Sequence, residues 1–444
     1  MAVTPAESAI YGALLSDDAV AALFGDEAEI RAMLDAEAAL AAAQAERGMI
    51  PPDAAARIAT ALAGTRIAPG SLAAGTASAG VPVGPLVAAA REAVGGEAAG
   101  WLHFGATSQD IVDTALVLRL RGALDILDAR LAALVELLGA RADEHRATVM
   151  TARTRWQQAT PTTFGLRIAG WMTPLAAHRI RLAELRPRLL CVQLGGASGN
   201  MAAMGENGVA VMEAMAAKLG LAAPTLPWHT ARETLAELAS WLSLVTGSLG
   251  KMGRDMTLLA QNEVAEARGG GGGGSSTMPH KANPVVAEML VALARQNAGL
   301  VSAMHHALVA EHERSGEAWT VEWLTLPQMA VATAVALRHA GAIAETLTAD
   351  PAAMRANIEA ADGMLLAEAA VFALARHMPR EAAQALVAAA CRDAAAEGLH
   401  LRDELCRRSD APVDWDAVFE PANYTGAADA LVDRALAAAR ATLP

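Results

Sequence analysis

The chain has 444 residues, of which 54% are hydrophobic and only 3% aromatic, and its formal net charge is −13. This composition excludes intrinsic disorder and predicts extensive burial of aliphatic side chains. Because the negative charge repels phosphate backbones and anionic lipid surfaces, we expect no nucleic-acid partner and no membrane partner.

The N-terminal part of the sequence lacks targeting features. The first basic residue is Arg31, so the basic start of a secretory signal is missing. Residues 67–90 are uncharged, but Pro69, Pro82 and Pro85 interrupt them, and we expect a loop-rich connection there. Three scattered cysteines are too few for a disulfide framework or a cysteine-based zinc site: Cys191, Cys391 and Cys406. These features predict a cytoplasmic protein.

Apolar residues recur in alternating steps of three and four through the middle of the chain. Such seams run through residues 120–138, 235–259 and 286–308. They predict long helices packed as a bundle, while strand patterns rich in Val, Ile and Thr are nearly absent. We therefore predict an all-α fold.

Glycine, proline and helix-capping residues mark the boundaries of three predicted helical domains. Residues 1–105 form an N-terminal helical domain that ends in a Gly- and Pro-rich region. Thr107-Ser108-Gln109-Asp110 is typical of a helix N-terminus with an acid in its first turn, and it opens a central bundle at 106–349. Asp350-Pro351 is typical of a cap followed by the first helical position, and it opens a C-terminal helical domain at 350–444.

A glycine run at residues 269–274 precedes a cluster of polar residues that includes Ser275, Lys281 and Asn283. Because glycine has high backbone freedom, we expect a mobile loop that closes over a site. A flexible linker is the alternative for the glycines alone. A nucleotide-binding P-loop is disfavoured, since no Gly-Lys-Ser/Thr follows them.

Three segments resemble conserved regions of the fumarase/aspartase superfamily. The pattern GSxxMxxKxN at residues 274–283 resembles its signature, and HFGATSQD at 103–110 and RTRWQQATP at 153–161 resemble its first and second regions. The resemblance implies a three-domain helical fold with a central long-helix bundle. It also implies a homotetramer whose active sites are shared between subunits and need no metal or organic cofactor.

The resemblance implies roles for individual residues. Ser275 matches the catalytic serine, and Lys281 with backbone N–H groups would stabilise its alkoxide. The remaining positions would bind substrate carboxylates: His103, Thr107, Ser108, Arg153, Arg155, Gln157, Asn283 and Arg314. Plain helix capping is an equally good explanation of Thr107 and Ser108, and surface ion pairing explains any one arginine taken alone.

Departures from the pattern indicate a branch of the superfamily. Arg155 stands where adenylosuccinate lyases have a catalytic histidine, and Trp323 stands where they have a phosphate-binding arginine, which tryptophan cannot replace. Residues 311–327 and Trp228-His229-Thr230 instead resemble the 3-carboxy-cis,cis-muconate cycloisomerases.

The reaction implied by that branch is the lactonisation of a small conjugated tricarboxylate, in the protocatechuate branch of the β-ketoadipate pathway. Ser275 would be the general acid of lactonisation. Two alternatives stay open: a lyase that releases fumarate from adenylosuccinate or argininosuccinate, and a catalytically silent helical homologue.

Overall fold

The computed structural model of the protein describes residues 4–274, 277–278 and 281–443. These residues form two compact units, each assembled from separate stretches of the chain. Unit 1 comprises Met1–Arg130, His178–Gly247 and Leu293–Ala336. Unit 2 comprises Leu131–Ala177, Ser248–Ala292 and Leu337–Pro444.

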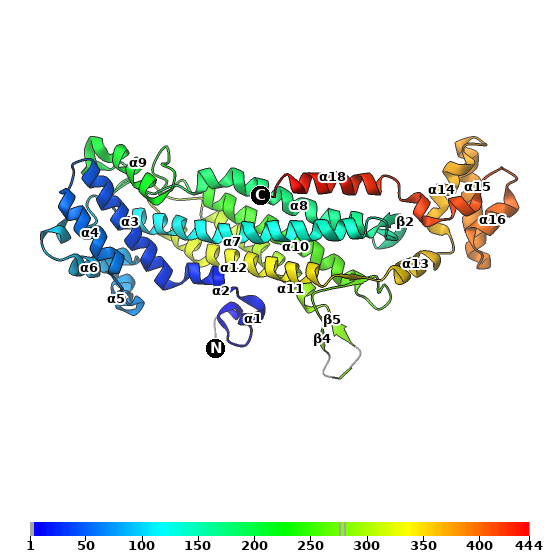
Figure 1. Ribbon diagram of the computed structural model, residues 1–444, viewed down its shortest axis with the longest axis horizontal. Helices are drawn as coiled ribbons and strands as arrows, with labels where there is room; N and C mark the ends of the chain where they lie inside the picture. Colours follow the sequence, from blue (N-terminus) through cyan, green and yellow to red (C-terminus); the bar gives the residue numbers. More distant parts are fainter. Residues whose placement is uncertain (1–3, 275–276, 279–280, 444) are drawn as a thin grey trace. The chain divides into compact units, whose positions relative to one another are not determined.

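Long helices contribute residues to both units (Figure 1): α7 (Ser108–Glu144), α8 (Phe164–Leu189), α10 (Glu233–Leu259), α11 (Val285–His306) and α12 (Gly316–Glu345). Each predicted apolar seam lies on one of them, although the third continues two residues beyond the end of α11. In unit 1, the Trp241 indole on α10 donates a 2.9 Å hydrogen bond to the His178 carbonyl on α8. The Asn297 amide on α11 donates one of 3.1 Å to the Thr333 hydroxyl on α12. The predicted all-α class is therefore confirmed.

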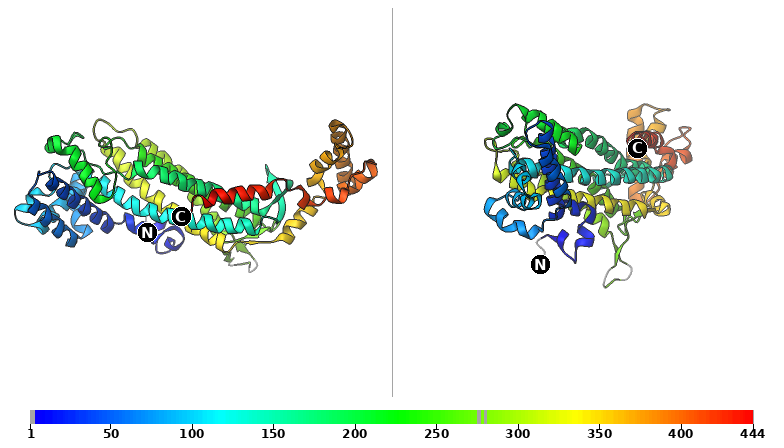
Figure 2. Two further views of the ribbon diagram at one scale, coloured as in Figure 1. Left: turned by 45° about the horizontal axis from the view of Figure 1, so that its top comes forward. Right: turned by 60° about the vertical axis from the view of Figure 1, so that its left-hand side comes forward.

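Shorter helices complete unit 1: α1 (Gly12–Leu15), α2 (Asp18–Ala21), α3 (Asp26–Glu46), α4 (Pro52–Gly64), α5 (Pro69–Ala79), α6 (Val83–Val94) and α9 (Gly208–Leu219). Their apolar faces enclose a core that includes the fully buried Leu86, Leu102 and Ile111. Figure 2 shows these helices in two further views. Short 3₁₀ helices lie in unit 1 at Pro5–Glu7, Ala22–Phe24, Glu97–Trp101 and Ala202–Asn207, and in unit 2 at Met364–Leu366 and Pro421–Tyr424.

The expected loop-rich connection over residues 67–90 is wrong. Pro69 begins α5, a position at which a missing backbone N–H costs nothing. Gly80 ends that helix in the left-handed conformation, with a φ of 76°, and Pro82 caps α6. The prolines and glycines of this stretch mark helix boundaries and do not prevent helices.

Unit 2 adds short antiparallel strand pairs to its helices: β1 (Val149–Thr154) with β2 (Gln157–Thr163), β3 (Ala267–Arg268) with β6 (Thr348–Ala349), and β4 (Gly273–Gly274) with β5 (Ala282–Asn283). Its remaining helices are α13 (Pro351–Glu359), α14 (Ala367–Leu374), α15 (Arg380–Glu397), α16 (Leu401–Arg408), α17 (Trp415–Val418) and α18 (Ala428–Arg440). The predicted cap is confirmed, because the Asp350 side chain accepts from the Ala353 N–H at the start of α13.

Close packing requires glycine at several positions of the run at residues 269–274. Gly270 has a φ of 81°, and a Cβ there would lie 2.9 Å from Cγ1 of Ile343. At Gly273 a Cβ would lie 2.6 Å from Cγ2 of Val285. Side chains at these positions would push the run away from α11 and α12, so the glycines hold the start of the signature segment close to the helices.

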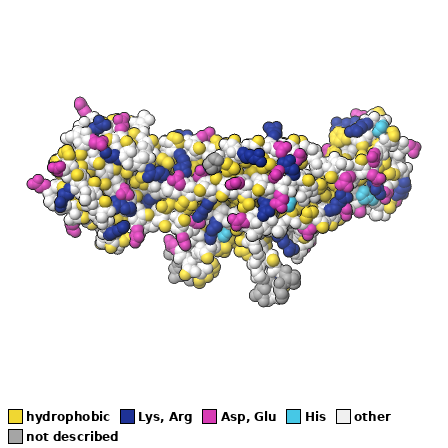
Figure 3. All heavy atoms as spheres, viewed as in Figure 1, with side chains coloured by type: hydrophobic (Ala, Val, Ile, Leu, Met, Phe, Trp, Pro, Cys, Tyr) yellow, Lys and Arg dark blue, Asp and Glu magenta, His cyan; other side chains and the backbone are white. Residues whose placement is uncertain are grey.

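Acidic and basic side chains are interspersed with hydrophobic ones on the face drawn in Figure 3. Of the helices that the described residues form, none is long and apolar enough to cross a membrane.

Candidate active site

The first turn of α7 is organised by the side chain of Asp110. Thr107 is the N-cap residue, and its carbonyl accepts from the Asp110 N–H at 3.1 Å. In return, the Asp110 carboxylate accepts from the Thr107 N–H at 2.9 Å, as in a capping box. The predicted helix start is thus confirmed. Asp110, the third residue of the helix, completes the cap by accepting from the Thr107 N–H.

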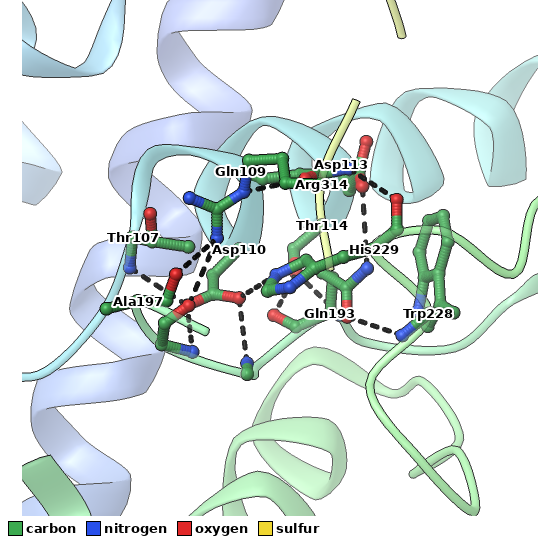
Figure 4. A network of polar contacts seen from close by, with 12 residues as sticks. Thr107, Gln109, Asp110, Asp113, Thr114, Gln193, Ala197, Trp228, His229 and Arg314 are labelled. Atoms are coloured by element: carbon green, nitrogen blue, oxygen red, sulfur yellow. Dashed lines mark hydrogen bonds and ion pairs between the residues drawn. The ribbon is translucent and has the colours of Figure 1, made fainter. Parts of the chain in front are cut away.

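Asp110 also binds two distant segments, as Figure 4 shows. Its Oδ1 accepts from the Gly195 N–H and from Nε2 of His229, both at 2.8 Å. Its Oδ2 accepts from the Gly196 N–H at 2.9 Å in addition to the Thr107 N–H. The carboxylate is completely buried and has four donors, which satisfies its oxygens and fixes three segments against one another.

The glycines at this junction are required by its geometry. A Cβ on Gly195 would lie 2.7 Å from Cε1 of His229, which is too close for real atoms. Gly196 has a φ of 67°, a conformation that favours glycine. Both backbone N–H groups can therefore point at Asp110.

Arg314 is held at the same junction by neutral acceptors. Its Nε donates to Oε1 of Gln109 at 3.1 Å, and its Nη2 donates to the carbonyls of Gly196 and Ala197 at 3.2 Å each. Gln109 in turn donates to the His229 carbonyl at 3.0 Å. These carbonyl partners fix the orientation of the guanidinium but leave its positive charge available to a ligand.

The hydroxyl groups of Thr107 and Ser108 are half-buried, and within the described residues neither has a hydrogen-bond partner. Because Thr107 caps α7 with its backbone, its side chain is available for another role. Both hydroxyls lie at the start of a long helix, where the helix dipole favours an anion. The carboxylate-binding role of these two residues stays a prediction.

His103 is a further group in unit 1 that can carry a positive charge. Its Nδ1 lies 2.6 Å from Oε1 of the fully buried Glu37, and its φ is 64°. Burial lowers the pKa of His103, but the hydrogen bond and the charge of Glu37, with a smaller contribution from Asp110, outweigh burial and raise the pKa above its ordinary value. The ring is therefore held in its protonated form over a wider pH range.

A buried ion cluster of Arg232, Asp113 and Glu322 lies one helical turn beyond Asp110 on α7. Arg232 contacts Asp113 at 2.6 and 3.1 Å, and its Nε donates to Glu322 at 2.8 Å. The Trp319 indole donates to Asp113 at 3.0 Å. The carboxylates keep the pKa of the Arg232 guanidinium above its ordinary value despite the burial that opposes this. The cluster joins α7, α12 and the start of α10.

The predicted residues of the second region lie in unit 2. Arg153 forms a bidentate ion pair with the buried Glu266, with both contacts at 2.7 Å. Asn357 donates to the same carboxylate at 2.8 Å. Arg155 and Gln157 are exposed at the turn that joins β1 and β2. The Arg153 charge is thus compensated within the chain, whereas Arg155 has no ion-pair partner among the described residues.

The signature segment also lies in unit 2, on the β4–β5 pair. Gly274 pairs with Ala282 and Gly273 with Asn283, so Asn283 is anchored in the ribbon. Lys281 is exposed, and its backbone N–H donates to the Met278 carbonyl at 3.0 Å. Ser275 lies outside the described residues.

The structure thus brings Thr107, Ser108 and Arg314 together at one junction in unit 1, with His103 in the same unit. The other described candidates belong to unit 2: Arg153, Arg155, Gln157, Lys281 and Asn283.

Sequence reasoning missed the central role of Asp110 and its partner His229. Two features of the sequence could have indicated these residues: the acid in the first turn of the predicted helix, which is Asp110, and the Trp-His-Thr segment, which contains His229. Among the described residues, no group of three or more His, Cys, Asp or Glu side chains is placed to hold a metal ion.

The chain has extensive similarity to known proteins. Residues 15–299 match the sequence family described as Lyase, and residues 363–435 match Adenylosuccinate lyase C-terminus. The chain is 45% identical to the 3-carboxy-cis,cis-muconate cycloisomerase of Pseudomonas aeruginosa over 94% of this chain and 93% of that protein. It is 34% identical to the N-acetyl-S-(2-succino)cysteine lyase of Dickeya dadantii, over 94% and 93% respectively. The crystal structure of 3-carboxy-cis,cis-muconate lactonizing enzyme from Pseudomonas putida superposes with a TM-score of 0.92 at 42% identity, covering 98% of this chain and 100% of that one.

Proposed function

Since the chain belongs to the fumarate lyase superfamily, we propose that it is a cofactor-independent cycloisomerase that converts 3-carboxy-cis,cis-muconate to a carboxymuconolactone. The observation that carries the proposal is the 45% identity to a cycloisomerase of that name along nearly the whole chain. The fumarate lyase superfamily is another name for the fumarase/aspartase superfamily, so the same comparisons confirm the resemblance predicted from the sequence.

The side chain of Trp323 supports a substrate without a phosphate. Its ring packs on Trp319 with a centroid separation of 4.7 Å and an edge-on geometry. An arginine at this position would serve a nucleotide substrate, as the resemblance to adenylosuccinate lyases implies. An indole ring offers no charge to a phosphate, which favours a small carboxylate substrate.

The proposed reaction is an isomerisation, so that no atom is lost. One carboxylate oxygen of the substrate adds to a carbon of the conjugated diene, and the resulting negative charge is delocalised into the carboxylate beside the neighbouring carbon. A proton delivered to that neighbouring carbon completes the γ-lactone. The protein must therefore hold carboxylates, stabilise an enolate-like anion and supply one proton.

Residues of both units fit these tasks. The Thr107 and Ser108 hydroxyls with the Arg314 guanidinium would hold one carboxylate, and His103, whose pKa is raised, adds positive potential in the same unit when it is protonated. Lys281 and Asn283 would bind another carboxylate, and Ser275 would be the general acid. We propose that the protein forms a homotetramer in which each active site takes these segments from more than one chain.

The test is a direct assay of the purified protein. The conjugated diene of 3-carboxy-cis,cis-muconate absorbs in the ultraviolet, and lactonisation removes that absorbance. We expect its loss to depend on the protein and to yield the lactone in equal amount. Absence of turnover with this diene would refute the proposal.

A fumarate-releasing lyase is the second candidate. It is favoured by the 34% identity to the lyase of Dickeya dadantii, which is named for N-acetyl-S-(2-succino)cysteine. Fumarate appearing from a succinyl adduct such as that compound, adenylosuccinate or argininosuccinate, without consumption of the diene, would decide for it. A protein inactive with all of these substrates would be a silent homologue.

A further inference from the structure

A cationic cavity of about 660 Å³ lies in unit 2 between the β1–β2 hairpin and the facing surfaces of α8 and α10. Apolar side chains such as Leu166, Leu258 and Trp171 form part of its wall. Its charged lining is predominantly basic: Arg153, Arg155, Arg167 and Lys251, against Asp255. In a chain of net charge −13, such a concentration of positive charge predicts an anionic ligand.

Two of these cations are compensated inside the chain. Arg153 is held by the bidentate contact to Glu266 described above. Lys251 pairs with Asp255, which also accepts from the Trp171 indole at 2.8 Å. Neither pair leaves a net charge in the cavity.

Arg155 and Arg167, in contrast, have no compensating carboxylate bound to them among the described residues. Within the described residues, neither guanidinium has a hydrogen-bond or ion-pair partner. Arg167 is half-buried on α8, and this burial lowers its pKa, with the charge of Asp255 opposing the shift. A partly desolvated guanidinium without a partner is unfavourable, and an incoming carboxylate would remove that cost by forming paired N–H···O contacts.

The position of Arg155 supports the same conclusion. Arg155 and Trp156 occupy the hairpin turn with φ values of 49° and 71°, and Trp156 is 75% exposed. Both line the cavity. The left-handed turn therefore carries a charged and an aromatic residue, both of which are partly open to solvent and line the cavity.

We propose that Arg155 and Arg167 together form a binding seat for one carboxylate of the substrate, with the apolar wall against its carbon skeleton. This assignment rests on the proposed function for the identity of the substrate, a tricarboxylate. Arg167 thereby becomes a specificity-determining residue: it binds a carboxylate that a substrate with one carboxylate fewer lacks.

The experiment compares R167Q and R155Q with R254Q as a matched control. Arg254 lies on α10, is exposed and does not line the cavity, so R254Q makes the same charge change elsewhere in unit 2. Binding of propane-1,2,3-tricarboxylate to the full-length protein is measured by calorimetry, and the diene assay gives KM and kcat. For each cavity variant we expect the Kd and the KM to rise about tenfold, as the loss of one charged contact implies, while kcat changes much less.

The melting temperature of the ligand-free protein distinguishes a binding role from a structural one. Because burial is the largest influence on the Arg167 pKa and lowers it despite the charges of Asp255 and Glu266, we expect the melting temperature of R167Q to stay the same or rise. A lower melting temperature with unchanged tricarboxylate binding would assign Arg167 to structure and overturn the proposal. Equal binding by wild type, R167Q and R254Q would overturn it as well.

The two proposals can fail separately. If wild type does not convert the diene but binds the tricarboxylate through Arg167, the binding seat stands and the proposed function falls. If wild type converts the diene and R167Q has an unchanged KM, the proposed function stands and the seat falls.

Discussion

Nε2 of His229 lies 2.8 Å from Oδ1 of Asp110, although the two residues are 119 positions apart in the sequence. The contact ties the segment before α10 to the first turn of α7. Because the same carboxylate orders the Gly195–Gly196 turn, the position of Arg314, which binds the Gly196 carbonyl, depends on it as well. A single buried acid thus sets the geometry of the proposed carboxylate-binding junction.

Replacing Asp110 by asparagine should destabilise the protein substantially. An amide cannot accept from all the donors that surround it, so buried N–H groups lose their partners, at a cost of about 3 kcal/mol in unfolding free energy. Urea denaturation measures this change. D125N is the control, since Asp125 on the same helix forms an exposed pair with Arg186. Equal losses in the two variants would contradict the role assigned to Asp110.

Replacing Arg232 by methionine should cost about 3–5 kcal/mol, because it leaves Asp113 and Glu322 buried without their cation. R188M, which removes an exposed pair with Glu237, should leave the denaturation midpoint unchanged. Chemical denaturation of both variants checks the contrast. Similar midpoints for the two would show that the cluster contributes no more than a surface pair.

The pair of His103 and Glu37 should make stability depend on pH. Because the pKa of His103 in the folded protein is raised above 6.5, the protonated ring stabilises the fold fully below about pH 6.5. This contribution is lost as the pH rises through the raised pKa. The unfolding free energy of wild type minus that of H103Q should therefore fall with increasing pH. E37Q should remove the same dependence, and a difference that grows with pH would contradict the assignment.

Replacing Ser275 by alanine should lower kcat for diene consumption by at least about 10²-fold, since a positioned acid–base group contributes that much. The circular dichroism spectrum and melting temperature should stay those of wild type. S276A is the neighbouring control and should retain activity. A full rate in S275A would remove Ser275 from the mechanism.

Features set by neighbouring residues in the chain were predictable from the sequence. The apolar seams identified the long helices α7, α10 and α11 but not α8 and α12, and the caps at Thr107 and Asp350 identified two helix starts. Residues 67–90 were misjudged because proline and glycine interrupt a helix in its interior but suit its ends, and position within the helix decides between the two.

The candidate site was predictable only in part. Motif resemblance identified Thr107, Ser108 and Arg314, which the structure brings to one junction. The distant partners of Asp110 and Arg153 were not predictable, because Gly195 lies 85 residues from Asp110 and Glu266 lies 113 residues from Arg153 in the sequence. No local pattern indicates which charges will be paired in the fold, and that pairing is what separates Arg153 from Arg155 and Arg167.

The buried cluster of Arg232, Asp113 and Glu322 also constrains how the protein can evolve. A change at any one of the three leaves a buried charge unbalanced, so the set tolerates concerted replacement far better than successive single steps. Arg155 and Arg167 form no ion pair with a residue that the structure describes, so replacing either one leaves no buried carboxylate without its cation. If the proposed carboxylate-binding role of the cavity holds, a single substitution at Arg155 or Arg167 changes substrate preference without unbalancing this cluster.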